Sequence, residues 1–134
     1  MAKSKINQEI LISKKSLNKE IEIFKKNKDL FKRVNFHKHS NCKMHVMLMM
    51  YKKNFDYPFH FSLDKPETFI LIRGKFLIRV KEKKGIKEYL LDNKNLFSYK
   101  INRNIFHKII PLSTISVALE VLEGPYKKNS VKKI

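Results

Sequence analysis

From residue 33 onward, the sequence is a succession of short segments rich in β-branched, aromatic and Met residues, and no helical pattern separates them. The connections, such as KKNFDYP, EKKG and DNKN, carry the Gly, Pro, Asn and Asp residues typical of turns. Lys84 and Gly85 have the chemistry of a hairpin corner, because glycine adopts a positive φ without strain. Closely spaced strands without helical crossovers favour antiparallel pairing, so we expect roughly seven strands in a sandwich or barrel.

The N-terminal part follows a different period. Its apolar residues recur at intervals of three, four and seven, with Lys and Glu between them, at Ile6, Ile10, Leu17, Ile21 and Phe24. This spacing places the apolar side chains on one face of a helix. We expect one amphipathic helix over residues 6–30, or two short helices broken near Ser13 or Ser16.

The length of 134 residues fits a single domain, and an apolar fraction of 43% is enough to build a core. We expect a helical segment over residues 1–32 that packs on the outside, a β domain over 33–126 and a short basic tail over 127–134. The Met run in MHVMLMM is expected to fill the core, because Met packs well into irregular interiors.

The formal net charge of +18 raises the question of nucleic acid as a partner. Most of this charge is Lys spread along the whole chain, and Lys is less suited than Arg to bidentate phosphate or base recognition. We therefore do not expect nucleic acid to be the physiological partner. The single cysteine, Cys42, excludes an internal disulfide, and no apolar run is long enough for a membrane span. These features predict a cytoplasmic protein without membrane insertion.

Three polar residues stand out among the predicted strands. Successive side chains alternate along a strand, so His60 and Ser62 share a face, and Glu67 shares one with Arg73. If the strand at His60 pairs with the strand that begins at Glu67, across LDKP, the imidazole and the carboxylate can meet. A divalent metal would satisfy both groups in a dry interior, and His107 would add a second imidazole. Two histidines and one carboxylate leave coordination positions open for water or substrate.

The spacing of these residues resembles a known family. His60-Phe61-Ser62, four residues, Glu67, six residues and Gly74 resemble the first cupin motif, in which two histidines precede a glutamate and a glycine. The later INRNIFH resembles the second cupin motif, which leads into the third histidine. Within the cupins, residues 33–126 resemble the WbuC-like cupin-fold metalloproteins, which are associated with bacterial surface-polysaccharide gene clusters. The supporting residues are His45-Val46-Met47, Tyr57-Pro58-Phe59-His60, Lys65-Pro66-Glu67, Glu120 and Glu123-Gly124-Pro125-Tyr126.

The resemblance implies a mostly β fold, a small antiparallel jelly-roll β-barrel with an N-terminal α-helix, and a homodimer. It implies a divalent metal, Zn, Fe, Mn or Ni, held by His60, Glu67 and His107. By the same resemblance, the protein acts on a sugar or sugar nucleotide in surface-polysaccharide synthesis, as an isomerase or epimerase. His45 or Tyr99 would then move the proton.

Two residues at the expected site have alternative interpretations. Ser62 stands where the family pattern has its second histidine, and we expect it to contact substrate instead. The departure also favours a metal-free cupin that binds a carbohydrate or a small anionic ligand without catalysis. Arg73 either points inward, where it would pair with Glu67 or bind a phosphate of the substrate, or faces solvent.

Three further histidines, His37, His39 and His45, precede the motif. One of them either replaces the missing ligand or acts as a general base, since histidine titrates near neutral pH. Alternatively, they are partly exposed strand histidines.

Overall fold

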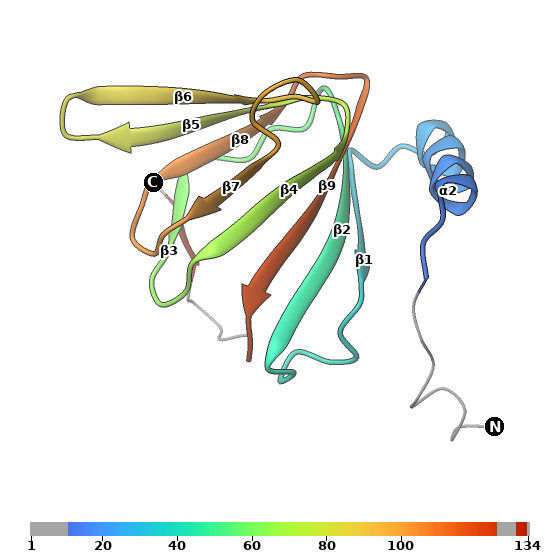
Figure 1. Cartoon of the computed structure of the whole chain (residues 1–134), viewed down its shortest axis with the longest axis horizontal. Coiled ribbons are helices and arrows are strands. Elements are labelled where there is room, and N and C mark those ends of the chain that lie inside the picture. Colours follow the sequence, from blue (N-terminus) through green and yellow to red (C-terminus); the bar gives the residue numbers. More distant parts are fainter. Residues whose placement is uncertain (1–10, 126–130, 134) are drawn as a thin grey trace.

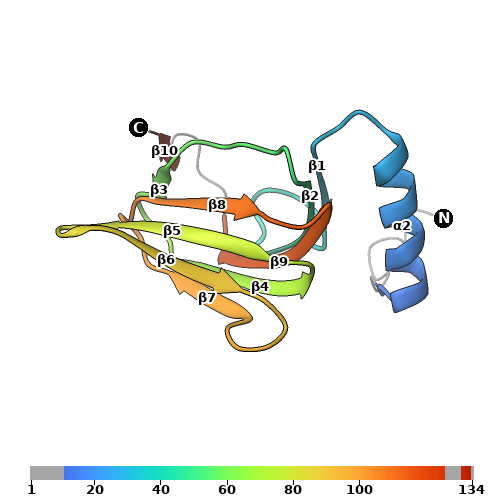
Figure 2. The ribbon, with the colours of Figure 1, turned by 90° about the horizontal axis from the view of Figure 1, so that it is seen from above.

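The computed structural model describes residues 11–125 and 131–133, and these form two five-stranded sheets. Figures 1 and 2 show the sheets and the helix that lies beside them. One sheet has the order β1 (Phe31–Asn35), β2 (Met44–Lys52), β9 (Ile115–Glu123), β4 (Glu67–Arg73), β7 (Ser98–Ile101). The other has the order β10 (Val131–Lys133), β3 (His60–Ser62), β8 (His107–Pro111), β5 (Phe76–Glu82), β6 (Gly85–Leu91).

All strand pairs within the sheets are antiparallel, which confirms the predicted jelly-roll class. The two sheets form a sandwich and do not close into a barrel, which corrects the expected closure. The hairpin corner is also confirmed, because Gly85 pairs with Glu82 and has a φ of 125°. No helix in the described part of the chain is long and apolar enough to cross a membrane.

The core lies between the sheets, and β2 is buried on both of its faces. Met47, Met49 and Tyr51 belong to the cluster inside the sandwich, whereas Leu48 and Met50 pack toward the helix. This double burial explains the nearly continuous apolar sequence of the strand. Met47, Met49 and Met50 of the Met run are buried in the core, as predicted, whereas Met44 at its start is exposed.

Helix α2 (Lys14–Lys26) covers the outer face of β2 and β9 (Figure 2). It begins after Ser13, whose hydroxyl accepts a hydrogen bond from the backbone N–H of Ser16 at 3.0 Å. The Ser16 hydroxyl accepts one in return from the Ser13 N–H at 2.9 Å, which completes a capping box. The buried helix residues Leu17, Ile21 and Phe24 pack against Leu48, Met50, Ile115 and Val117. Ser13 was one of the two expected break points, and residues 6–10 lie outside the described residues.

The segment ETFILIRGKFLIRV contains β4 and most of β5. Gly74 separates them with a φ of 81°, and a Cβ at this position would lie 2.9 Å from the backbone oxygen of Ile115. Before this turn, the pairing of β4 with β9 shifts register between Leu71 and Arg73. This β-bulge changes which residues of β4 face the interior.

The expected pairing of the strands at His60 and Glu67 is wrong. Strand β3 pairs with β8 and β10, and β4 pairs with β7 and β9, so the two residues lie on different sheets. The LDKP connection carries the chain from one sheet to the other instead of forming a hairpin turn. Pro66 contributes to this because it has no N–H with which to continue a strand ladder.

Candidate functional site

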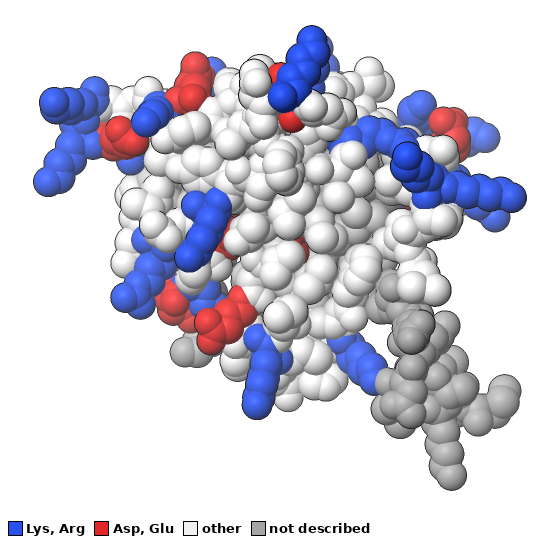
Figure 3. Space-filling model, viewed as in Figure 1, with Lys and Arg blue, Asp and Glu red and all other residues white. Residues whose placement is uncertain are grey.

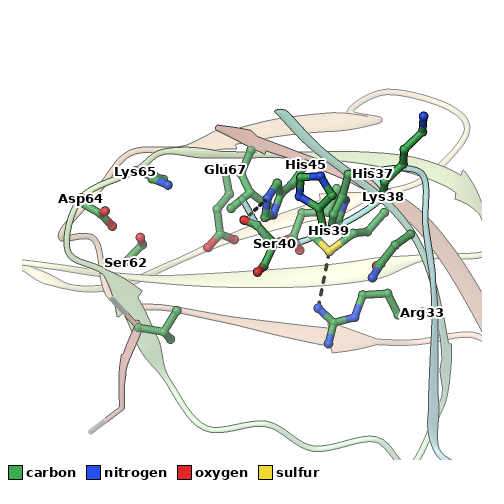
Figure 4. Close-up of a pocket in the computed structure, with 15 residues that line it drawn as sticks. Arg33, His37, Lys38, His39, Ser40, His45, Ser62, Asp64, Lys65 and Glu67 are labelled. Atoms are coloured by element: carbon green, nitrogen blue, oxygen red, sulfur yellow. Dashed lines mark hydrogen bonds between the residues drawn. The ribbon is translucent and has the colours of Figure 1, made fainter. Parts of the chain in front are cut away.

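Two adjoining cavities, of about 410 Å³ and about 330 Å³, open between the sheets in the described part of the chain. Four residues line both cavities, and we call them the neck: Arg33, Glu67, Glu120 and Val131. The larger cavity, the basic compartment, is otherwise lined by Asn35, His37, Lys38, His39, Ser40, His45, Met47, Ser62, Asp64, Lys65 and Leu122 (Figure 4). The smaller cavity, the aromatic compartment, is otherwise lined by Phe31, Met49, Tyr51, Phe55, Tyr57, His60 and Ile109.

Strand register explains why charged neck residues face the interior. Glu120 lies opposite Met47, and Arg33 lies opposite Met49, two residues of the sandwich core. Glu67 lies opposite Leu122, which also packs against that core. Directly opposed residues of paired strands project to the same face of the sheet. Neighbouring strands therefore bring two carboxyl groups and one guanidinium group to the same internal space.

The neck carboxyl groups are electrostatically unusual. Burial raises the pKa of the Glu67 carboxyl. Burial and then the neighbouring charge of Glu67 raise the pKa of Glu120 to about 8, and the Arg33 guanidinium opposes that rise. Neither carboxyl group forms an ion pair with a described residue. The Arg33 guanidinium contacts the Met47 Sδ at 3.5 Å instead, so these groups are available to a ligand.

His60 and His107 come together on β3 and β8. They are directly paired in the strand register, and their ring centroids lie 4.3 Å apart. Each ring places Nδ1 beside a backbone carbonyl oxygen two residues earlier, at 3.0 Å from Pro58 and 2.9 Å from Ile105. A carbonyl accepts only, so Nδ1 carries the proton and Nε2 keeps its lone pair. The Nε2 of His107 is buried and has no hydrogen-bond partner among the described residues.

Both imidazoles are neutral at physiological pH. Burial lowers the pKa of His60 and lowers that of His107 to about 4, because a charged ring is poorly solvated there. Neutral rings with a free Nε2 are the form that ligates metals. However, no group of three His, Cys, Asp or Glu side chains among the described residues is arranged to hold a metal ion. The two histidines supply two of the three expected ligands, and Glu67 does not complete the set in this arrangement.

The other histidines take up positions around the basic compartment. His45 is buried, donates a hydrogen bond from Nε2 to the Ser40 carbonyl oxygen at 2.9 Å and stacks on His37, with ring centroids 4.0 Å apart. His39 has its Nδ1 2.9 Å from the Oδ1 of Asn41. Ser62 is 8% exposed and lines the same compartment. None of these histidines is placed in a three-residue metal group within the described part of the chain.

Arg73 and Tyr99 lie away from both cavities. The bulge in β4 places Arg73 opposite Val117, on the helix side of the sheet, where it lines a groove with Gly74 and Ile115. Arg73 is therefore not brought to Glu67. Tyr99 lies opposite Phe69 and packs on Tyr89, with ring centroids 4.8 Å apart.

The sequence alone did not identify Arg33, Glu120 or the rings of the aromatic compartment as residues that line a cavity. Glu120 had a readable signal, because it is an acidic residue within the otherwise apolar TISVALEVL. A charged residue at a core-facing position of a strand has no packing reason to be there. Arg33 had no such signal, since its side of an edge strand depends on the register.

Neither a family model nor a curated protein matches the sequence. Among solved structures, the capsular polysaccharide assembling protein CapF from Staphylococcus aureus is 21% identical, with a TM-score of 0.67 over 81% of this chain and 33% of that chain. KdgF from Halomonas sp. is 9% identical, with a TM-score of 0.60 over 75% of this chain and 83% of that one. Oxalate oxidase is 8% identical, with a TM-score of 0.62 over 81% and 57%.

This chain spans about a third of the length of CapF. At these identities the likeness concerns the fold, and CapF and oxalate oxidase both have the cupin fold. The two-sheet sandwich and these likenesses define the class: the protein is a cupin-fold jelly roll.

Proposed function

We propose that the protein is a WbuC-like cupin that binds a sugar or sugar nucleotide between its sheets and acts in bacterial surface-polysaccharide synthesis. The observation that carries the proposal is the neck, where Arg33, Glu67 and Glu120 face a cavity whose wall is aromatic. Carboxyl and guanidinium groups exchange hydrogen bonds with sugar hydroxyls, and aromatic faces pack against sugar C–H groups. The fold likeness to a capsular polysaccharide assembling protein supports the setting.

We extend the proposal to isomerase or epimerase chemistry. Such a reaction needs a base that removes a proton beside a carbonyl group and an acid that protonates the carbonyl oxygen. His60 lines the aromatic compartment as a neutral ring, and its Nδ1 is engaged by the Pro58 carbonyl. The Nε2 atom is therefore the proton acceptor offered to a substrate. Glu120, with its raised pKa, holds a proton at the neck that it can donate.

A divalent metal is an alternative use of the same histidine, because the single lone pair on His60 Nε2 cannot accept a proton and bind a metal at once. His60 and His107 would hold it through Nε2, and Glu67 would have to approach from the opposite sheet. When bound, the metal would polarise a carbonyl oxygen as a Lewis acid. The metal-free alternative, a binding protein without catalysis, is favoured by Ser62 at the position of a usual ligand and by the missing third ligand in the described part of the chain.

Elemental analysis tests the metal. The protein should be purified without a polyhistidine tag or chelator, alongside His107→Ala and the control His39→Ala. We expect about one metal per chain in the wild type and in His39→Ala, and none in His107→Ala. The proposed site has few protein ligands, so the loss of one should weaken metal binding strongly. Equal metal content in all three proteins would sink the assignment. No metal in the wild type would favour the metal-free alternative.

Calorimetry tests the carbohydrate site itself. Titration with UDP-glucose, dTDP-glucose and GDP-mannose should reveal binding that falls about tenfold or more in Glu67→Gln/Glu120→Gln, because each amide offers one oxygen acceptor where the carboxyl group offers two. Glu123→Gln on the exposed end of β9 is the matched control. Binding that is unchanged in the neck variant would place the ligand elsewhere. Product formation, followed by NMR, would then separate an enzyme from a binding protein.

A further inference from the structure

The two compartments differ in chemistry on either side of the neck. Apart from the neck, the aromatic compartment has four aromatic residues, Phe31, Tyr51, Phe55 and Tyr57, with His60 among them. Apart from the neck, the basic compartment has Lys38 and Lys65 against the single acid Asp64, together with three histidines. A ligand that fills the whole space therefore meets ring faces at one end and hydrogen-bond donors at the other.

The basic compartment contains donors whose hydrogen-bonding capacity is not fully used within the fold. The Nδ1 of His37 makes no well-formed hydrogen bond with a described residue, although the backbone carbonyl of Val46 partly stabilises the charged form of the ring. Ser62 is only 8% exposed, and its hydroxyl makes no hydrogen bond with a described residue. Figure 4 shows Ser62 and Lys65 on one side of this compartment and His37 and Lys38 on the other. Buried polar groups normally have hydrogen-bond partners, so these side chains suggest that a polar ligand binds here.

Lys65 is fixed at the rim of this compartment, because its Nζ donates a hydrogen bond to the carbonyl oxygen of Pro125. An ammonium group has three donors, so donors remain for a ligand. Lys38 forms no ion pair with a described residue. Several cationic and neutral donors around one space suit an anion that presents several oxygen acceptors, and a phosphate ester presents three.

Arg33 connects the two ends. Its guanidinium carbon lies 5.8 Å from the centroid of the Phe31 ring, and its Nη1 lies 3.5 Å from Met47 Sδ. These contacts hold the planar group without using up its five donors. A guanidinium group at the neck can therefore bind an anionic group that enters from the basic compartment, while the neck carboxyl groups contact what lies beyond it.

The aromatic compartment provides the complementary end. Phe55 and Tyr57 have nearly parallel rings, 3° apart in orientation, with centroids at 6.4 Å. Both rings are partly exposed and line the space beside Phe31. Aromatic faces of this kind accept the C–H face of a pyranose ring and are poor partners for a phosphate group.

We propose that the internal space binds a phosphorylated sugar in one orientation, with the sugar ring in the aromatic compartment and the phosphate in the basic compartment against Arg33. This inference rests on the proposed carbohydrate function and deepens it by naming the ligand class and its direction. A sugar phosphate and a sugar nucleotide share this chemistry. In the second case, the nucleoside lies toward the open side of the basic compartment, where Lys38 is exposed.

Calorimetric titration with four probes tests the basic compartment. The probes are methyl glucoside, glucose 1-phosphate, UDP-glucose and inorganic phosphate. We expect both phosphorylated sugars to bind at least about tenfold more tightly than methyl glucoside, and to lose that advantage in Arg33→Met and in Lys38→Met. Lys83→Met is the control, because Lys83 lies in the β5–β6 hairpin, outside both cavities. This variant also loses one positive charge, but the phosphorylated sugars should still bind more tightly than methyl glucoside.

Tyr57→Ala tests the aromatic end with the same probes. It should weaken methyl glucoside and both phosphorylated sugars by a similar factor and leave inorganic phosphate unchanged. Circular dichroism of each variant ensures that a loss of binding is not a loss of fold. Tighter binding of UDP-glucose than of glucose 1-phosphate supports a nucleotide ligand, and equal binding supports a sugar phosphate.

Three results would overturn the inference. Methyl glucoside that binds as tightly as glucose 1-phosphate would remove the phosphate site while leaving a carbohydrate site in place. If Tyr57→Ala and Arg33→Met each weakened the binding of every probe by the same factor, the proposed orientation of the ligand would be rejected. No binding by any of the sugar probes would reject the proposed function together with this inference.

Discussion

Glu67 and Glu120 illustrate how single residues can serve a site at the expense of the fold. Two carboxyl groups on neighbouring strands face the same internal space, and neither forms an ion pair with a described residue. Burial of an unpaired charge is unfavourable, so the pair responds by holding a proton. A stable core alone would have an apolar residue at position 120, where Met47 is opposite.

The titration of Glu120 predicts a pH dependence of stability. The pKa of this carboxyl group is about 8 in the folded protein against an ordinary value of 4.5. Between these values Glu120 binds more protons in the folded than in the unfolded state, so the stability of the wild type relative to Glu120→Gln should fall as pH rises, by at most about 1.4 kcal/mol per pH unit. Glu120→Gln lacks this titration and should be more stable than the wild type at pH 8.

Urea denaturation at pH 5, 6.5 and 8 measures this effect, with Glu123→Gln as the control on the same strand. Glu123 is exposed, so its replacement should leave the slope unchanged. A wild-type stability that is flat or rising across the same pH range, with no difference from Glu120→Gln, would contradict the raised pKa of the neck.

At the scale of elements, the sandwich depends on strands that are covered on both sides. Strand β2 presents Met47 and Met49 to the interior and Leu48 and Met50 to α2. Helix α2 is short and begins with a capping box, and three of its residues are buried. Most helical stability in proteins comes from such tertiary packing. The helix is therefore a structural cover of the sheet and has no part in lining the two interior cavities.

Replacement of Phe24 by Ala tests this role of α2. Phe24 is completely buried, so the change should destabilise the protein by about 3–5 kcal/mol through lost packing and a cavity. Ile23→Ala is the matched control, because Ile23 is 47% exposed and should lose no more than about 0.5 kcal/mol. Chemical denaturation measures both. Equal, small losses would show that the helix is not anchored on β2 and β9.

The limits of prediction from this sequence also lie at the scale of elements. Alternation and turn residues are local properties, so they indicated most of the strands and the hairpin corner at Gly85. Ten strands are described where roughly seven were expected, and β10 lies in the segment expected as a tail. The partner of a strand is not a local property, which is why β3 and β4 were expected in one sheet. The bulge before Gly74 is likewise not visible in the local pattern, and it places Arg73 on the helix side of the sheet instead of the side that faces the cavities.

The site was predictable only in part for the same reason. The spacing of His60 and His107 matched a family pattern, and the register places them opposite each other. The neck could not be predicted from the sequence, because Arg33 on β1 and Glu120 on β9 are far apart along the chain. Their strands become close only because both pair with β2, one on each side. Whether a metal binds at His60, Glu67 and His107 stays a prediction.

At the scale of the whole molecule, the net charge of +18 is dispersed. On the face that Figure 3 shows, Lys and Arg of the described residues stand at separate places around the outline and do not form one patch. A nucleic-acid interface is expected to gather such residues along one stripe or groove. Arg33, Lys38 and Lys65 instead line the internal space, where the proposed ligand would bind. The homodimer expected from the resemblance also stays a prediction.

Strand β10 has a practical consequence for anyone who handles this protein. It pairs with β3 at the edge of a sheet, and its Val131 lines both cavities. A fluorophore or an affinity handle attached just after this strand would stand beside the binding space and compete with whatever enters it. The exposed face of α2 is outside the sandwich, so a surface-immobilised sample should be tethered there, through a cysteine introduced on that face.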